Sequence, residues 1–584
     1  MEEDELMNLN VSTRNGRTYM YIEKGYRDIN GKPRKKNIQT IGYADKYENE
    51  YDDPVAHFRE VVRKMNEEGQ NNGSVALTID MDEELPEGSI GTRNLGYALL
   101  LKVYHELNID KYLKSKAQKA NFKFNTNSIM MLLVISRILS PGSKKKAYEE
   151  KSRYFERFDF TLDDIYRSLT HYNNMSDELQ KHVYEGVRDK YGSDTSVIYY
   201  DVTNYYFEIK RPDEFRKYGV SKEKRKRPVV QLGLAMDRDG VPLHYEAFPG
   251  NKLDKETFRS VIGDVRRKYD TGRVVVVADM GVITGDNIYY LVGGKPEKPQ
   301  NGYIFGFSVR GGTQKFQDYV LDEAGYTEVG GEPVNDETGF KIKDRVTARN
   351  INVTMADGSI QTKNVYEKQI VFWSKKHFLK SRAEREEIIA KAEALIADPK
   401  KFTKATSYGA AAYVNNLNYD KKTGEYLDTG KKLSLDVAKI KEEELFDGYY
   451  SLVTSELNMP VSETIDTYRG LWEIEESFKI TKSDLEARPV YVQSREHINA
   501  HFLTCYIALT IIRVIQKKIN KEYSAAKIIG CLNKIECINE EENIYLFGYR
   551  SHISETLGRV FDIDFMKKRL FLSDIKNILS KVKI

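Results

Sequence analysis

The spacing of apolar residues predicts a helical region followed by an α/β region. Leu95–Leu107 and Ser128–Leu139 carry apolar residues at helical intervals, so we expect residues 93–190 to be rich in helices. From residue 195 the pattern changes to short apolar runs, which are typical of strands. We expect strands at 195–201, 228–236, 242–248, 273–279 and 302–308, and helices at 255–268 and 285–292.

The flanking segments have patterns of their own. Residues 1–80 predict a small hairpin, with an alternating run from Thr18 and a turn at 31–35, followed by a helix near 55–66. Residues 311–445 predict an insertion that begins with strands at 340–353 and 361–373 and continues as a helix at 382–397. A strand at 448–454, a long helix from Pro460 to about Asp484 and a helix at 495–518 come next. The chain therefore divides into 1–80, 81–190 (helical), 191–310 (core, first part), 311–445 (β-rich insertion), 446–520 (core, second part) and 521–584 (helical).

Composition excludes several protein classes. The chain has 584 residues, too many for one hydrophobic core, and a net charge of +3. It lacks a run of 18 apolar residues, and its first residues are acidic, so we expect neither a membrane span nor a secretory signal. The three cysteines (Cys505, Cys531 and Cys537) have no paired Cys/His clusters, which argues against a zinc site. A reducing cytoplasm is the simplest location.

Positive charge is concentrated directly after the strand predicted at 195–201. Between Glu208 and Arg227 there are nine Lys or Arg residues and four acids, and the stretch ends in Lys224, Arg225, Lys226 and Arg227. Charge runs of this kind are usually solvated loops. Beside clustered acids, however, a basic loop suits a polyanionic ligand.

Three acids are the strongest candidates for chemistry. Asp201 and Asp279 each end an apolar run, and Glu475 lies on the long predicted helix. Tyr468, Glu475 and Lys482 are seven residues apart, so they project from nearly one face of a continuous helix. Each Asp alone is common as a turn residue, and the helix alone could be simply amphipathic. Three carboxylates brought together repel one another unless cations neutralise them, and hard oxygen ligands select magnesium or manganese.

These residues and several motifs resemble bacterial insertion-sequence transposases of the DDE type, in the group marked by a Tyr-Arg-Glu-Lys signature. The likeness runs from about residue 90 to about residue 515 and rests on the order of short motifs at 140–144, 200–208, 231–243, 248–251, 277–281, 446–449, 468–490 and 497–502. The resemblance implies a ribonuclease H-like mixed sheet flanked by helices, interrupted by a β-rich inserted domain and preceded by a helical region. The predicted strand order fits that core. One departure is clear: the signature arginine is Leu471 here, and Arg469 lies about 200° away from it on a helix.

The resemblance also implies an activity. It implies that Asp201, Asp279 and Glu475 hold two Mg²⁺ or Mn²⁺ ions and that the protein cuts DNA at insertion-sequence ends and joins the 3′-OH ends to target DNA. Terminal inverted repeats and target DNA would be its partners, in a synaptic complex with a second copy of the chain. Tyr468, Lys479 and Lys482 would bind phosphates, and the region 81–190 is a further candidate for DNA binding. The alternatives are a metal-dependent nuclease without strand transfer and a non-catalytic DNA-binding protein.

Other suggestive residues are better explained by structure. Trp373 could stack on a base, but its strand context favours a core role. His497 and His501 are four residues apart without the glutamate of a zinc motif, so we expect structural roles for both. The Gly424–Lys432 segment lacks the spacing of a phosphate loop, and we predict no nucleotide site there.

Overall fold

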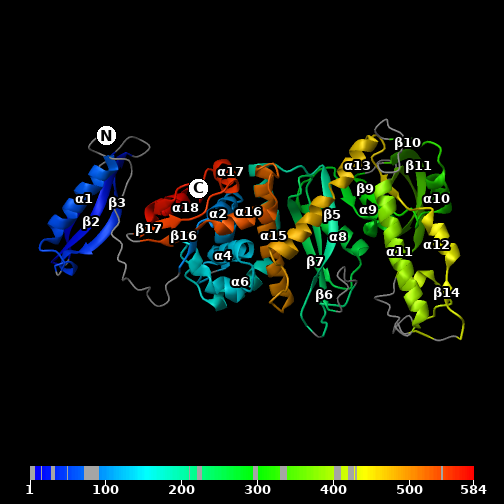
Figure 1. Ribbon diagram of the computed structural model, residues 1–584, viewed down its shortest axis with the longest axis horizontal. Coiled ribbons are helices and arrows are strands. Elements are labelled where there is room, and N and C mark those ends of the chain that lie inside the picture. Colours follow the sequence, from blue (N-terminus) through cyan, green and yellow to red (C-terminus); the bar gives the residue numbers. More distant parts are fainter. Residues whose placement is uncertain are drawn as a thin grey trace. The chain divides into compact units, whose positions relative to one another are not determined.

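The computed structural model folds into two compact units, whose elements are labelled in Figure 1. It describes residues 7–14, 16–27, 33–48, 50–70, 91–120, 122–209, 211–219, 227–293, 300–328, 339–399, 409–418, 426–427, 430–540 and 543–583. Unit 1 comprises Met1–Arg93, Glu536–Tyr549 and Met566–Lys581. Unit 2 comprises Asn94–Ile535, Arg550–Phe565 and Val582–Ile584.

Unit 1 begins with a three-stranded antiparallel sheet, which contains the predicted hairpin as its second and third strands and adds a strand before it. Strands β1 (Met7–Arg14), β2 (Arg17–Arg27) and β3 (Pro33–Tyr43) pair in sequence order, and helix α1 (Pro54–Gln70) follows. Met20, Ile22 and Val62 are buried. The first strand escaped prediction because its polar residues outnumber its apolar ones.

The C-terminal segment 521–584 is mixed, so the prediction of a helical region was wrong in part. Its strands β16, β17 and β18 pair antiparallel in that order and belong to unit 1. These strands are only three or four residues long, which leaves too little alternation to detect. The elements are α16 (Ala525–Lys534), β16 (Glu536–Asn539), β17 (Ile544–Phe547), α17 (His552–Phe561), β18 (Arg569–Phe571) and α18 (Leu572–Lys581).

The helical region of unit 2 packs around one long helix, α15 (Arg495–Lys518). Helices α2, α4, α6 and α7 contact α15, which also contacts strand β7 (Pro242–Pro249) of the main sheet (Figure 1). By length and composition α15 could cross a membrane, but 94% of its apolar stretch is buried within the protein, as expected of a core helix. The region contains α2 (Tyr97–Glu106), α3 (Ile109–Ala120), α4 (Thr126–Leu139), α5 (Lys144–Glu149), α6 (Leu162–Asn174) and α7 (Ser176–Tyr191), and the short strand β4 (Arg93–Asn94) precedes it.

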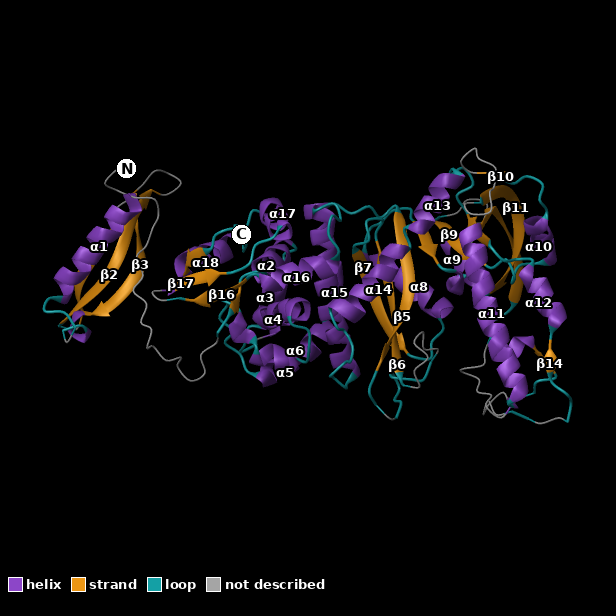
Figure 2. Cartoon of the chain, viewed as in Figure 1, coloured by secondary structure: helices purple, strands orange, loops and turns teal. Residues whose placement is uncertain are grey.

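A nine-stranded mixed sheet forms the centre of unit 2, and its first part has the predicted order (Figure 2). β5, β6 and β7 are antiparallel, whereas β8 pairs parallel with both β5 and β9. A large apolar core lies between this sheet and α8, with Phe258 and Val261 fully buried. The elements are β5 (Val197–Tyr206), β6 (Val229–Met236), β7 (Pro242–Pro249), α8 (Asp254–Lys268), β8 (Val275–Ala278), α9 (Gly285–Leu291) and β9 (Gly302–Phe307).

Most strand residues of the inserted segment extend this sheet, and β13 and β14 pair with each other in a separate two-stranded sheet. The sheet order is β10-β11-β12-β15-β9-β8-β5-β6-β7, so the long β11–β12 hairpin reaches the core through β15. A smaller cluster that includes Ala392 and Tyr413 packs the rest of the segment. The elements are α10 (Gln314–Leu321), β10 (Thr327–Glu328), β11 (Phe340–Thr354), β12 (Ile360–Ser374), α11 (Lys375–Ala397), β13 (Val414–Asn415), β14 (Ser434–Leu435), α12 (Val437–Glu444) and β15 (Tyr449–Thr454).

The long helix predicted from Pro460 to Asp484 is divided into three pieces. They are α13 (Val461–Arg469), α14 (Trp472–Lys479) and a π-helical turn, Ile480–Asp484. Apolar periodicity continues through both junctions, so the sequence pattern could not reveal them.

Candidate active site

Asp201 and Asp279 lie side by side on neighbouring parallel strands. β5 and β8 pair through Tyr200 and Ala278, and each aspartate is the next residue of its chain. Asp279 keeps an extended backbone, with φ −74° and ψ 165°. Asp201 does not end its strand as predicted, because the β-branched and aromatic residues after it continue the pairing of β5 with β6 up to Tyr206. The two acids therefore occupy one row across the sheet.

Both aspartates face away from α8. Tyr200 and Ala278 belong to the core on the α8 side, and the hydroxyl of Tyr200 lies 2.6 Å from that of Thr257. Successive side chains of a strand point to opposite faces, so Asp201 and Asp279 point to the other face.

The α13–α14 segment covers the face to which the aspartates point. On β5, Tyr199 shares this face and donates a hydrogen bond to the carbonyl of Thr467 at 3.2 Å. Tyr205 shares it too, and its hydroxyl lies 2.9 Å from that of Thr481. Asp201 lies between these tyrosines, and Glu475 lies between the two threonines on the segment that crosses β5. The tertiary structure thus brings Glu475 to the face that carries Asp201 and Asp279.

Two tyrosine hydroxyls lie near Asp279 and Glu475. The hydroxyls of Tyr468 and Tyr450 lie 2.7 Å apart. They are seated over Gly306, where an added Cβ would come within 2.5 Å of the Tyr468 oxygen. Burial raises the pKa of both phenols, and the nearby charges of Asp279 and Glu475 raise them further, so both remain neutral hydrogen-bonding groups.

The break between α13 and α14 alters the predicted alignment of Tyr468, Glu475 and Lys482. Gly470 and Leu471 form tightened turns with i to i−3 hydrogen bonds, and the π-helical turn shifts the phase again before Lys482. Tyr468 is half-buried against Tyr450 while Glu475 is exposed. The predicted alignment rested on one continuous helix, and the structure divides that helix into three pieces.

Leu471, which stands where the resemblance places an arginine, is buried. Together with Ile474 and Phe478 it forms the predicted apolar stripe, and these side chains are 8%, 0% and 7% exposed. Arg469 is exposed and pairs with Asp466 at 3.2 Å. Position 471 thus serves packing in this chain.

The three acids differ in exposure and do not form a closed metal site. Asp279 and Glu475 are exposed and Asp201 is half-buried. The carboxylate of Asp201 accepts a hydrogen bond from the Val202 backbone N–H at 2.7 Å, and that of Asp279 accepts one from Met280 at 2.7 Å. Within the part of the chain that the structure describes, no three His, Cys, Asp or Glu side chains are grouped closely enough to hold a metal ion. Their oxygen donors and accessibility nevertheless suit a hard divalent cation.

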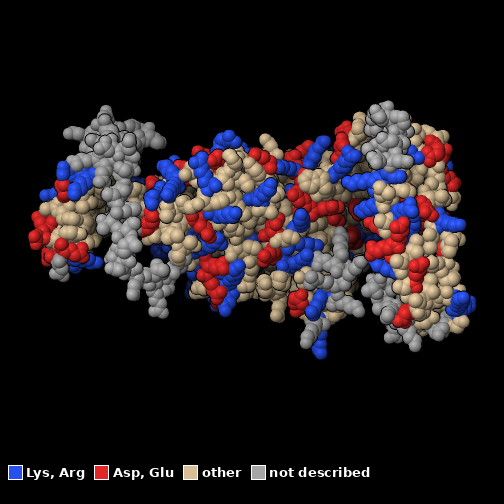
Figure 3. Space-filling view, viewed as in Figure 1, with Lys and Arg blue, Asp and Glu red and all other residues tan. Residues whose placement is uncertain are grey.

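The candidate phosphate-binding residues are only partly described. Lys479 is exposed, and the ammonium of Lys482 lies 5.7 Å from the ring centre of Tyr205. Arg227 pairs with Glu208 at 3.3 Å. Lys224, Arg225 and Lys226 lie outside the described residues. On the face shown in Figure 3, basic and acidic side chains are interspersed, in keeping with the small net charge.

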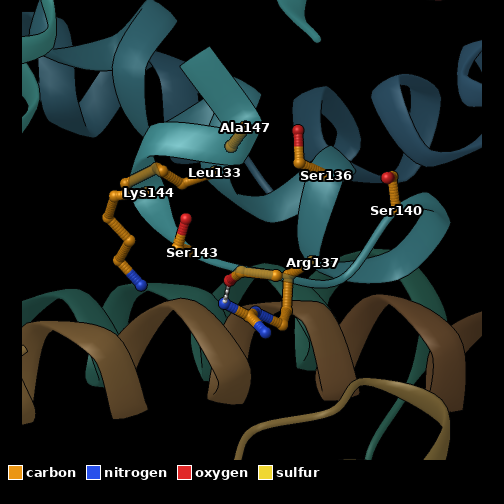
Figure 4. Close-up of a pocket in the computed structure, with 8 residues that line it drawn as sticks. Leu133, Ser136, Arg137, Ser140, Ser143, Lys144 and Ala147 are labelled. Atoms are coloured by element: carbon orange, nitrogen blue, oxygen red, sulfur yellow. Dashed lines mark hydrogen bonds between the residues drawn. The ribbon is translucent and has the colours of Figure 1, made fainter. Parts of the chain in front are cut away.

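Buried cations hold the segment that follows Lys482. Arg137 of α4 donates to the carbonyl oxygens of Leu485, Glu486 and Gly142 at 3.2, 3.0 and 2.7 Å. Figure 4 shows Arg137 and Lys144 extending toward the same side of a small pocket.

Lys144 in turn contacts α15. Its ammonium lies 2.8 Å from Nδ1 of His501, whose Nε2 lies 2.9 Å from the carbonyl of Ala487. Burial, with the charge of Arg137, lowers the pKa of Lys144 to about 7. His501 therefore has the structural role that we predicted.

Trp373 also has a structural role in the described fold. It is half-buried, and its indole N–H donates to the carbonyl of Asp447 at 3.0 Å.

The sequence did not identify Arg513, which contacts α14 from α15. One signal was present, because Arg513 is the only charged residue between Ala500 and Gln516, in the middle of an apolar helix. Such a charge is expected to be paired when it is buried.

The comparisons with known proteins agree with this geometry. A model of the family described as "Transposase DDE domain" matches residues 192–511, more than half of the chain, and the match includes all three acids. A second model, "IS1634 family transposase, N-terminal domain", matches residues 9–76. No curated protein matches the chain. The chain therefore belongs to the DDE transposases of insertion sequences.

Proposed function

We propose that this transposase cleaves phosphodiester bonds at the ends of its insertion sequence and transfers the 3′-OH ends to target DNA. One observation carries the proposal: Asp201 and Asp279 share a row and a face of the sheet, and the segment with Glu475 crosses that face. The family match over residues 192–511 supports the same reading.

Asp201, Asp279 and Glu475 would hold two divalent ions, Mg²⁺ or Mn²⁺. Carboxylate oxygens are the donors that these ions prefer, and Asp279 and Glu475 are exposed to incoming DNA. When bound, such ions lower the pKa of an attacking water or hydroxyl and stabilise the leaving oxygen. The signature subgroup stays a prediction, because its arginine is replaced by the buried Leu471.

DNA would be held by the cations around the acids. Lys479, Lys482 and Arg227 would contact phosphates, as would Lys224–Lys226 of the same basic stretch. The hydroxyl of Tyr468 can accept from Tyr450 and still donate to a phosphate oxygen. Residues 81–190 remain a further candidate for DNA contact.

The assembly would join two copies of the chain and two terminal inverted repeats before the target is captured. We propose that it forms in the cytoplasm, on the nucleoid. Light scattering of the protein with and without terminal-repeat DNA measures the mass of the complex and so tests this stoichiometry. A complex that holds two terminal repeats but only one copy of the chain would contradict it.

The chemistry is tested with the full-length protein, labelled terminal-repeat DNA and Mg²⁺. Asp201→Asn, Asp279→Asn and Glu475→Gln are each expected to abolish cleavage. Asp270→Asn, at an exposed position with φ 42°, is the matched control and should cleave normally. Normal cleavage by Asp201→Asn would refute the assignment.

The same assay separates the alternatives. Cleavage by the wild-type protein without joined product would favour a nuclease, and DNA binding without cleavage would favour a non-catalytic protein.

A further inference from the structure

The helix that carries Glu475 has few means of its own to fix its orientation. α14 is only eight residues long, and its N-cap, Leu471, makes no side-chain capping bond. Tightened turns precede it and a π-helical turn follows it. The apolar stripe of Leu471, Ile474 and Phe478 holds α14 against the core. Apolar contacts are non-directional, however, so they restrain the rotation of the helix about its own axis only weakly.

Arg513 of α15 supplies the directional contacts. Its Nε and Nη2 donate to the hydroxyl of Ser477 at 2.9 and 2.7 Å, and Nη2 also donates to the carbonyl of Glu473 at 2.5 Å. Nη1 donates to the carboxylate of Glu476 at 3.0 Å and to the side chain of Gln516 at 3.1 Å. Arg513 is 2% exposed, so water does not compete for these bonds.

The three glutamates of α14 differ in their contacts with cations. Glu473 and Glu476 both pair with Arg513, at 3.3 and 3.0 Å, and Glu473 also pairs with Lys521. Glu473 is buried beneath the β6–β7 turn, where an added Cβ on Gly240 would meet its carboxylate at 2.8 Å. Glu475, which lies between the two paired acids in sequence, is exposed. Glu473 and Glu476 are thus held by buried or partly buried cations, and Glu475 is the exposed acid of α14.

We infer that Arg513 is a positioning residue: its guanidinium fixes the rotation of α14 through Glu473, Glu476 and Ser477 and thereby sets the carboxylate of Glu475 opposite Asp201 and Asp279. The inference rests on the proposed catalytic role of Glu475. A side chain about 6 Å from a helix axis moves roughly 1 Å for a 10° rotation, and a shift of about 1 Å can cost about 100-fold in rate. Lysine cannot replace this fork, because it carries one point charge and no planar set of donors.

The test compares Arg513→Lys with Arg349→Lys in the full-length protein. Arg349 is a matched control, since it forms a two-bond ion pair with the buried Glu367 at 2.7 and 2.9 Å on strands away from α14. Ser477→Ala is a milder variant that keeps the ion pairs and removes the hydroxyl contacts. Each protein is measured for urea unfolding, for kcat and KM of terminal-repeat cleavage, and for Mn²⁺ binding by electron paramagnetic resonance.

We expect Arg513→Lys and Arg349→Lys to lose stability to a similar degree but to differ in chemistry. Arg513→Lys should lower kcat by about 50-fold or more, leave KM for DNA within about 2-fold and weaken Mn²⁺ binding, whereas Arg349→Lys should change none of the three beyond about 2-fold. Ser477→Ala should lower kcat by about 5- to 10-fold with the same signature, so it decides the matter if Arg513→Lys does not fold.

Two results would overturn the inference. One is an equal loss of kcat in the Arg513 and Arg349 variants; the other is unchanged kcat and Mn²⁺ binding in a folded Arg513→Lys or Ser477→Ala protein. The Glu475→Gln variant distinguishes a failure of the proposed function from a failure of the positioning role of Arg513. If Glu475→Gln cleaves normally, the proposed function fails; if it is inactive while the Ser477 and Arg513 variants are normal, only the positioning role fails.

Discussion

Gly470→Ala is expected to displace the helix that carries Glu475, although Ala is normally the better helix residue. A Cβ at Gly470 would lie 1.9 Å from the hydroxyl oxygen of Tyr199 and 2.5 Å from its ring carbon Cζ. Tyr199 is 3% exposed and sits on β5, which is paired on both sides, so its ring has no space to withdraw. The α13–α14 junction must therefore move away from the sheet.

The expected cost follows from these contacts. Overpacking of this kind costs about 1–3 kcal/mol. The hydrogen bond from Tyr199 to Thr467 is lost as well, at about 1 kcal/mol, and the smaller conformational freedom of Ala in the unfolded chain returns about 1 kcal/mol, because Gly470 has right-handed helical backbone angles that Ala adopts readily. We expect Gly470→Ala to destabilise unit 2 by about 2 kcal/mol and, through the shift of α14, to slow cleavage by about 10-fold or more.

Gly530→Ala provides the matched control. Gly530 lies inside α16, also in unit 2, and nothing lies within 4 Å of an added Cβ. The same substitution there should stabilise the protein by about 0.5–1 kcal/mol and leave cleavage unchanged. Urea unfolding and terminal-repeat cleavage measure both variants.

A double variant identifies the cause. Tyr199→Leu removes the clashing atoms, so Tyr199→Leu/Gly470→Ala should be less destabilised than the sum of its single variants by about 1 kcal/mol or more. Strict additivity, or a Gly470→Ala protein with wild-type stability and cleavage, would refute the reasoning.

Three further predictions concern pH and metal. Burial raises the pKa of Asp237 from 3.8 to about 6. Between these pH values the folded protein keeps a proton that the unfolded chain releases. This group therefore makes the stability of the protein fall as the pH rises from about 4 to about 6. Asp237→Asn, which keeps an acceptor for the Asp239 and Val241 N–H groups, should flatten that slope in urea unfolding; an unchanged slope would contradict the assignment. The pKa of Lys144 is lowered from 10.5 to about 7, so the unfolded chain binds more protons above pH 7 and stability should rise from about pH 7 to pH 10. Lys144→Met should remove this rise, and a persistent rise would assign it to another group. Chelation with EDTA should abolish cleavage and added Mn²⁺ should restore it, whereas cleavage that survives chelation would exclude the proposed carboxylate site.

Part of the fold was predictable because its signals are local. Four of the five core strands and the helices α8 and α9 were predicted within two residues at each end, since their apolar runs and turn residues lie within each segment, whereas β5 runs five residues beyond its predicted end. The inserted hairpin was predicted as strands, but its place in the same nine-stranded sheet was not. The residue pattern of one strand does not show which strand, far away in the sequence, it will pair with.

The candidate site divides in the same way. Asp201, Asp279 and Glu475 could be named from residue type and motif order, and so could the stripe that holds α14 down. The close approach of Gly470 to the hydroxyl of Tyr199 could not, because Tyr199 lies 271 residues earlier in the chain. The pairing of Glu473 and Glu476 with Arg513, which leaves Glu475 as the exposed acid of α14, likewise could not be seen in the sequence.

The sequence by itself determined the chemical inventory of this transposase: which acids, which cations and which strands could take part. Only the tertiary structure decided which face of the sheet Asp201 and Asp279 share, how the segment with Glu475 crosses it and which buried cations orient that segment. The physical reason is range. Secondary-structure preferences act over a few residues, whereas the orientation of a catalytic side chain is set by contacts among elements that meet only when the chain has folded.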